Sequence, residues 1–132
     1  MMALTADRNT PKQQAKTLVI RVGAGVKIFA GAQIVLSATG VAIPGKTATG
    51  LTYAGRAEEF VDNTGGADGA KTVEISRGSA FKWANDGSVT QAHLLKQAYV
   101  IDDATVGATD GGGTRSPSGR IVAVDSDGVW VE

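Results

Sequence analysis

The stretch GLTYAGRAEEFVDNTGGADGAKTVEISRG, residues 50–78, decides the fold class. In its last part, polar residues alternate with Val73 and Ile75, a period of two that is typical of a strand with one buried face. The middle, residues 63–70, is rich in Gly, Asn and Asp and predicts a turn. The first part alternates less regularly around Glu58 and Glu59, where we expect a β-bulge. The whole stretch therefore predicts a β-hairpin.

Composition extends this prediction to the rest of the chain. The 132 residues suit a single domain of ordinary size. Apolar residues make up 42% of the chain and aromatic residues only 5%, so the core must consist mainly of Val, Ile, Leu and Ala. The 18 glycines punctuate short β-rich runs at intervals of several residues. We predict an all-β protein: a small β-barrel or β-tulip-like domain over residues 17–132, with one short helix.

Four local patterns outside residues 50–78 predict specific elements. The segment 88–98 holds the only expected helix, with Thr90 as its N-cap. Residues 102–119 are dominated by Asp, Gly, Thr and Ser and predict a long exposed loop. Residues 120–132 predict a second hairpin, because Asp127-Gly128 is a strong turn signal between two apolar runs. Residues 1–16 contain Pro11, show no periodicity, and predict an extended arm.

Charge is distributed unevenly along the chain. Formal net charge is zero. Residues 1–46 carry six basic residues against Asp7, a net charge of +5, and the remainder carries seven basic and twelve acidic residues, a net charge of −5. A basic front and an acidic back suit head-to-tail association of copies or an acidic partner.

Several classes of protein are disfavoured by what the sequence lacks. Without cysteine, disulfides, thiolate metal sites and a Cys nucleophile are excluded. No run approaches the ~18 apolar residues that a membrane helix needs, and the N-terminal segment has no apolar signal-peptide region. We expect a soluble protein that is not exported.

The segment GVAIPGKT, Gly40–Thr47, matches the P-loop pattern G-x-x-x-x-G-K-[ST]. A working P-loop needs a helix directly after it, because the helix N-terminus holds the phosphates. The residues that follow, ATGLTYAG, do not continue a helix. Asp102, at the end of an apolar run, would be the candidate Mg²⁺ ligand of such a nucleotide site. We therefore read Lys46 as a hairpin charge, and nucleotide binding is the disfavoured alternative.

No catalytic or metal site is expected. His93 is the sole histidine and cannot build a common zinc site alone. The segment Asp125–Gly128 lacks the ligands of a complete Ca²⁺ loop. The adjacent carboxylates of Asp102 and Asp103, like those of Glu58 and Glu59, would point to opposite faces of a strand. We expect no enzyme activity, cofactor, metal or small-molecule substrate.

A small nucleic-acid-binding module of the OB type is the alternative of a different class. The basic front could follow phosphates. Such proteins usually interleave aromatic residues for base stacking, and the basic segment contains only Phe29. Phe81 and Trp83 lie later, among acidic residues, and are read as core residues or contacts between subunits. Nucleic acid is therefore not the expected partner.

An ordered series of segments resembles one family of structural proteins. The segments are MALTADRNTP, VKIFAGAQIVLSATGVAIP, AGRAEEFVDNTGGADGAKTVEISRG, YVIDDATV and DSDGVWV. They are similar to the head-decoration or cement proteins of tailed phages and prophages, across nearly the whole chain. Lys96-Gln97 stands where related sequences tend to have a Gly turn.

The resemblance implies a function, and the sequence pattern adds two sets of expected contact residues. It implies a capsid-stabilising virion protein without catalytic activity, which binds the outside of the capsid shell as homotrimers after assembly in the host cytoplasm. The implied partners are the major capsid protein and further copies of the chain, with no membrane involved. For shell binding we expect residues of the arm, namely Thr5, Arg8, Asn9, Lys12 and Lys16. For contacts between copies we expect Glu58, Glu59, Phe81 and Trp83.

Overall fold

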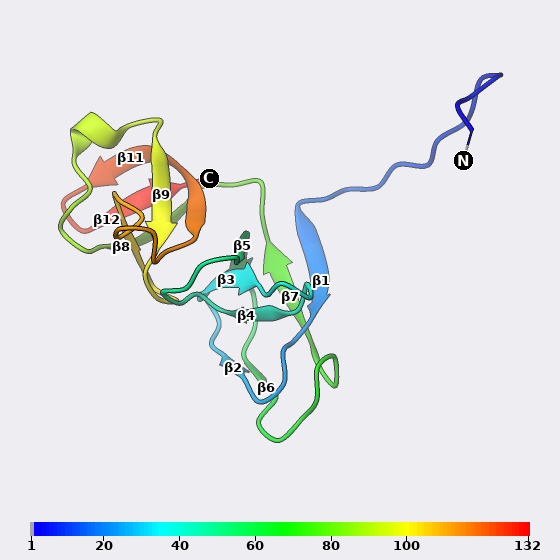
Figure 1. Ribbon diagram of the computed structural model, residues 1–132, viewed down its shortest axis with the longest axis horizontal. Helices are drawn as coiled ribbons and strands as arrows, with labels where there is room; N and C mark the ends of the chain where they lie inside the picture. Colours follow the sequence, from blue (N-terminus) through cyan, green and yellow to red (C-terminus); the bar gives the residue numbers. More distant parts are fainter. Residues whose placement is uncertain (1) are drawn as a thin grey trace.

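The computed structural model describes residues 2–132. Their regular elements are β-strands apart from one 3-10 turn, and these strands form two parts from which an N-terminal arm projects. Figure 1 shows the arm running from β1 away from both parts of the body. Every residue from 2 to 16 is exposed, as the sequence predicts for an extended arm. The arm is attached to the sheet at its last residue, where the Arg77 N–H donates to the Lys16 carbonyl oxygen (2.8 Å).

Residues 17–76 build an open antiparallel sheet with the order β1-β7-β5-β3-β4. A two-stranded ribbon, β2 paired with β6, extends from it (Figure 1). The strands of the sheet and ribbon are β1 (Thr17–Arg21), β2 (Lys27–Ile28), β3 (Gln33–Leu36), β4 (Ala42–Pro44), β5 (Thr52–Ala57), β6 (Val61–Asp62) and β7 (Thr72–Ser76).

The hairpin predicted over residues 50–78 is confirmed in part. β5 and β7 are antiparallel neighbours in the middle of the sheet, but only Arg56 and Ala57 of β5 pair with β7. After Ala57 the chain leaves the sheet and forms β6 against β2, so the two arms separate. The bulge expected at Glu58 and Glu59 lies earlier instead, where the register of β3 against β5 shifts beside Gly55. Gly55 has φ 142°, and a Cβ there would collide with the Ser76 carbonyl oxygen.

Residues 81–131 build a closed five-stranded barrel with the order β10-β8-β12-β11-β9. One pair, β10 with β8, is parallel, and the other four pairs are antiparallel. Its strands are β8 (Phe81–Asn85), β9 (Gln97–Val100), β10 (Thr105–Gly107), β11 (Pro117–Asp125) and β12 (Gly128–Val131). The predicted barrel exists, but its strands come from the second half of the range 17–132, because the earlier strands pair among themselves.

The second predicted hairpin is confirmed, and two other predictions are corrected. β11 and β12 pair around a turn between Asp125 and Gly128. The segment expected to be a long exposed loop contains β10 and the beginning of β11, because Val106 is fully buried in the barrel and pairs with Val100. The expected helix is a single 3-10 turn, Gln91–His93, after the N-cap Thr90. It ends early because Leu95 has φ 64° and β9 begins at Gln97.

Each part has its own apolar core of small aliphatic side chains. The sheet buries residues such as Ile28, Ile34, Val73 and Ile75. The barrel buries Val106, Ile121, Val129 and Val131 around two aromatic side chains. The composition, rich in Val and Ile and poor in aromatic residues, is thus distributed over two cores of moderate size.

A buried glutamine joins the sheet to the barrel. The Gln33 side chain is fully buried. Its Nε2 donates to the Asp102 carbonyl oxygen (2.9 Å), and its Oε1 accepts from the Ser118 hydroxyl (2.8 Å). Nearby, the Ser116 hydroxyl donates to the Ala48 carbonyl oxygen (2.7 Å) and accepts from the Leu51 N–H (3.0 Å). Buried polar groups with satisfied hydrogen bonds fix one relative position of the two parts.

Candidate functional site

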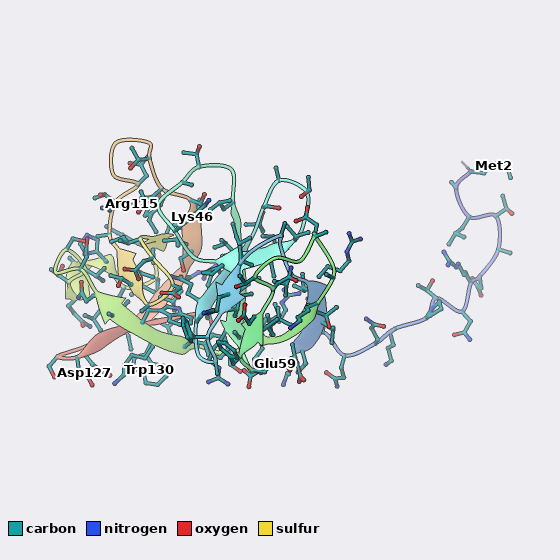
Figure 2. The ribbon with its side chains drawn as sticks, turned by 90° about the horizontal axis from the view of Figure 1, so that it is seen from below. Met2, Lys46, Glu59, Arg115, Asp127 and Trp130 are labelled. Atoms are coloured by element: carbon teal, nitrogen blue, oxygen red, sulfur yellow. The ribbon has the colours of Figure 1, made fainter. Side chains whose placement is uncertain are left out.

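The arm presents its polar and basic side chains to solvent. The five residues expected to bind the shell, Thr5, Arg8, Asn9, Lys12 and Lys16, are all exposed. The arm also carries two large apolar residues near its free end, Met2 and Leu4, which are 89% and 69% exposed. Figure 2 shows Met2 at the far end of the arm, well away from the strands. The arm is therefore available for contact with another molecule along its whole described length.

Glu58 and Glu59, expected at a contact between copies, lie on the exposed connection between β5 and β6. Arg56 forms an ion pair with Glu58 (2.7 Å) and donates to the same carboxylate oxygen through Nε (2.9 Å). Glu59 is exposed and labelled in Figure 2 near the middle of the molecule. Both positions are accessible to a second copy, which leaves the expectation for them open.

Phe81 and Trp83 are also expected at that contact, and both belong to the barrel core. Phe81 is 7% exposed and Trp83 is 4% exposed, and both pack in the barrel core. Their side chains alternate with Lys82 along β8, so they point inward while Lys82 points outward. Trp83 therefore has almost no surface left for a second copy, whereas Phe81 keeps a small exposed part in the wall of a groove described below.

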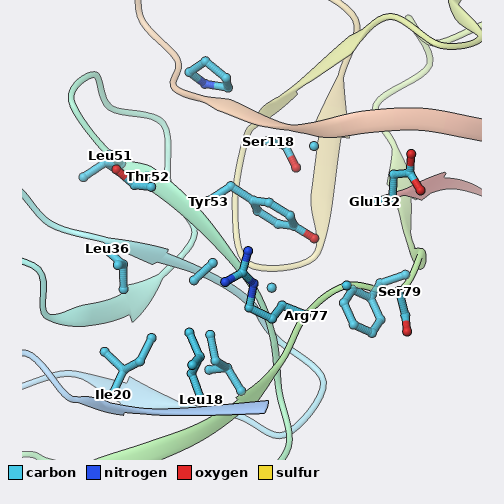
Figure 3. Close-up of a pocket in the computed structure, with 17 residues that line it drawn as sticks. Leu18, Ile20, Leu36, Leu51, Thr52, Tyr53, Arg77, Ser79, Ser118 and Glu132 are labelled. Carbon is cyan, nitrogen blue, oxygen red and sulfur yellow. The ribbon is translucent and has the colours of Figure 1, made fainter. Parts of the chain in front are cut away.

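A groove separates the open sheet from the barrel (Figure 3). It has a volume of about 620 Å³. One wall comes from the sheet, with Leu18, Ile20 and Leu36, and the other includes Phe81 and Pro117. Sequence reasoning missed this groove, because it exists only through the relative position of two parts that are far apart in the chain.

Tyr53 belongs to the lining of the groove and has an unsatisfied hydroxyl. Burial raises the pKa of Tyr53 above its usual value, and the nearby Trp83 indole opposes the rise. Within residues 2–132, neither the Tyr53 hydroxyl nor Trp83 Nε1 reaches a partner in hydrogen-bonding geometry. Both atoms have almost no accessible surface, so their lack of a partner is a cost of the fold and not a binding contact.

A second exposed apolar feature was not predicted. Phe29, directly after β2, and Phe60, directly before β6, are 57% and 53% exposed. Their rings face each other with centroids 5.5 Å apart and an interplanar angle of 44°. β2 and β6 pair in antiparallel register, which brings these two residues together from positions far apart in the chain. That pairing could not be read from local sequence.

The P-loop-like segment forms a strand rather than a phosphate loop. Residues 42–44 are β4, and Lys46 makes an antiparallel bridge to Asp102. The Thr47 hydroxyl donates to the Ile101 carbonyl oxygen (2.8 Å). No helix follows Thr47 in the described chain, because β5 comes next. The segment thus has none of the helix N-terminal amides that phosphate binding requires.

The remaining charged residues form local surface contacts. Lys82 and Asp127 make an exposed ion pair (2.9 Å), which lowers the pKa of Asp127 and raises the pKa of Lys82. Hydrogen bonds from Thr64 lower the pKa of Asp62. His93 accepts a hydrogen bond at Nδ1 from the Thr90 N–H (2.9 Å) and caps its own 3-10 turn. Among residues 2–132, no three His, Asp or Glu side chains gather in a way that could hold a metal ion.

Comparison with known proteins adds nothing to this description. No family model, curated protein or solved structure matches the chain. In the described part of the chain, no helix has the length and apolar character needed to span a membrane. The groove, the arm and the Phe29–Phe60 pair are therefore the features from which function must be argued.

Proposed function

We propose that this chain is a structural virion protein that binds the outer surface of a phage capsid and stabilises the head. The observation that carries the proposal is the arm, an exposed polypeptide with a net basic character attached to a β-body. Residues 2–16 hold Arg8, Lys12 and Lys16 against Asp7, a net charge of +2. An extended arm of this kind suits an acidic protein surface or the edge strand of a neighbour.

The proposed partners are the major capsid protein and further copies of this chain. An extended segment that adds to a sheet edge binds through its backbone, so its own sequence needs no apolar pattern. The side chains of Thr5, Arg8 and Asn9, with Lys12 and Lys16, would then supply charge and hydrogen bonds to the shell. A homotrimer multiplies a weak single-arm contact, because the second and third arms bind at a high effective concentration.

The test is attachment to undecorated heads assembled from the cognate shell protein, measured by co-sedimentation. We expect deletion of residues 2–16 to abolish attachment while the circular dichroism spectrum of the body stays unchanged, since these residues are exposed. We expect Arg8→Gln/Lys12→Gln/Lys16→Gln to weaken attachment about tenfold or more at low salt. The matched control, Lys71→Gln/Lys96→Gln/Arg120→Gln, removes three exposed basic residues of the body and should attach as the wild type does.

Attachment of the truncated protein at wild-type level would refute the role of the arm. Attachment lost equally in the matched control would mean that overall charge, rather than the arm, is responsible.

Binding of single-stranded nucleic acid is a second candidate, favoured by the exposed Phe29–Phe60 pair on the ribbon that also carries Lys27, with Asp62 opposite Lys27. Exposed aromatic rings next to basic residues provide stacking platforms for bases. This candidate predicts an affinity that falls steeply with salt and a loss of binding in Phe29→Ala/Phe60→Ala. A gel-shift assay at low salt without any retarded band would remove it.

A further inference from the structure

Two apolar surfaces of this chain lack a partner within residues 2–132: the groove between the sheet and the barrel, and the free end of the arm. Met2 and Leu4 are among the most exposed large apolar side chains of the molecule. The groove is an open apolar space lined on the sheet side by Leu18, Ile20 and Leu36. Each surface would gain stability by being covered, since burial of apolar area is favourable.

We infer that the groove receives the apolar end of the arm, Met2–Leu4, from a second copy of this chain. A volume of about 620 Å³ lies within the range of roughly 300–1,000 Å³ that is usual for ligand pockets, so two aliphatic side chains fit. The inference rests on the self-association included in the proposed function and names the contact that would carry it.

The polar part of the groove lining supports a peptide as the occupant. Tyr53 lines the groove together with Ser79 and Arg77 (Figure 3). An extended arm brings backbone carbonyl oxygens, and the exposed Arg77 and Ser79 side chains at the groove would donate hydrogen bonds to them. A purely apolar occupant would offer these two side chains no acceptor.

The sheet offers a docking edge directly beside the groove. β1 is an end strand of the sheet, and its Leu18 and Ile20 contribute to the groove wall. Val22, directly after β1, bridges to Ala42 of β4, so the docking edge is the part of β1 before Val22. An edge strand presents backbone groups that an extended segment can pair with. An incoming arm could therefore pair with β1 while alternate side chains enter the groove.

The direction of the arm favours a second copy over its own body. The arm leaves the sheet at Lys16 and runs away from both the sheet and the barrel (Figure 1). Residues 2–16 contain no glycine, although the chain has 18, and they contain Pro11, which favours extended backbone at Thr10. Fully extended, a segment of this length spans about 50 Å, enough to reach a neighbouring copy.

A contact of this kind joins two different surfaces, so it is heterologous and can close into a ring. Each copy would donate one arm end and receive another, which suits a trimer. The basic middle of each arm, from Thr5 to Lys16, would then lie between copies and remain free to contact a shell.

Disulfide trapping tests the inference. Because the chain has no native cysteine, every disulfide that forms must use the introduced cysteines. Two single-cysteine proteins are mixed in a redox buffer, one with Ala3→Cys in the arm and one with Ser79→Cys at the groove. Any disulfide between them joins two chains. Ser126→Cys, in the exposed turn between β11 and β12, replaces Ser79→Cys in the control mixture. We expect about tenfold more mixed disulfide with Ser79→Cys than with Ser126→Cys.

Two further variants separate apolar burial from chance collision. In the Ala3→Cys background, Met2→Ser/Leu4→Ser should reduce the mixed disulfide to the control level, because the arm end loses its apolar side chains. Both residues are exposed, so the body should keep its fold, as circular dichroism would show. Arg77→Gln in the Ser79→Cys background should lower trapping several-fold without loss of stability, because it removes exposed donors at the groove.

Mixed disulfide equal to that of the control mixture would overturn the inference. So would a doubly substituted Ala3→Cys/Ser79→Cys protein that forms its disulfide within one chain, since the arm would then fold onto its own groove. These outcomes are distinct from failure of the proposed function, because the attachment assay on heads depends on Arg8, Lys12 and Lys16. A chain that attaches to heads but shows no trapping would retain the proposed function and lose only this contact.

Discussion

The two halves of the body, the sheet and the barrel, differ in whether their strands are paired on both sides. The barrel closes on itself, so each of its five strands has neighbours on both sides. The open sheet ends at β1 and carries a protruding two-stranded ribbon with the exposed Phe29–Phe60 pair. Closure removes edges, whereas an open edge is a template for pairing with another chain. The surfaces available for partners therefore belong mainly to the sheet, and the closed barrel packs against the sheet and holds it in place.

The largest expected effect tests whether these halves unfold together. Ile75→Ala in the sheet and Ile121→Ala in the barrel each delete a fully buried side chain, and each should lower the free energy of unfolding by about 2–5 kcal/mol. Trp83 and Trp130 both belong to barrel strands, so tryptophan fluorescence reports on the barrel, while far-ultraviolet circular dichroism reports on both halves. In urea, the two signals should give one shared transition for each variant.

Val19→Ala is the control for that experiment, because Val19 is 68% exposed on β1 and should change stability by no more than about 0.5 kcal/mol. Separate fluorescence and circular dichroism transitions in Ile75→Ala would mean that the sheet melts while the barrel stays folded, and the halves would be independent.

A smaller effect is expected at the junction of the two halves. Gln33→Ala should lower the free energy of unfolding by about 1–3 kcal/mol, because the Ser118 hydroxyl loses its acceptor and the Asp102 carbonyl loses a donor. The same change at the exposed Gln14 of the arm should have no measurable effect on the urea midpoint. If Gln33→Ala matched Gln14→Ala, apolar packing alone would hold the sheet against the barrel.

The smallest effect concerns the exposed ion pair of the barrel. The pKa of Asp127 is lowered by Lys82, so its contribution is present above the unfolded pKa of about 3.9 and is lost as pH falls through the lower folded value. The pKa of Lys82 is raised, so its contribution is lost as pH rises through the folded value. Urea midpoints of the wild type and Asp127→Asn should therefore differ slightly near pH 6 and converge at low pH. A difference that persists undiminished below pH 2 would contradict this assignment.

Local features of the fold were predictable because they depend on neighbouring residues. The alternation in residues 72–76 identified β7, and Asp127-Gly128 identified the turn of the last hairpin. Lack of periodicity identified the extended arm, with all of residues 2–16 exposed. The all-β class followed from short apolar runs between glycines.

Features that depend on distant partners were not predictable from local patterns. β5 alternates imperfectly because it pairs with β3 for most of its length, and the bulge sits beside Gly55 rather than at Glu58. The helix predicted over residues 88–98 is only a short 3-10 turn, because Gln97–Val100 forms a strand that pairs with both β11 and β10 and closes the barrel. Phe81 and Trp83 point into the barrel core, and this orientation can be assigned only once the pairing of the barrel strands is known.

The candidate site was predictable to the extent that it consists of the arm. Thr5, Arg8 and Lys12 stand out through composition alone, and their exposure agrees with that reading. The groove and the Phe29–Phe60 pair arise from contacts between segments more than thirty residues apart, such as Ile28 with Val61. No local signal marks them.

The Gln33 junction also has a consequence for the order of events during synthesis. All strands of the sheet lie within residues 17–76 and leave the ribosome before any strand of the barrel. The Gln33 amide acquires its acceptor at Asp102 and its donor at Ser118 only when these later residues emerge. At about 5–20 residues per second, the nascent sheet spends several seconds with this polar group uncovered. During that interval the unfinished sheet exposes the surfaces that the barrel later covers, and the early chain is the form most vulnerable to wrong pairing.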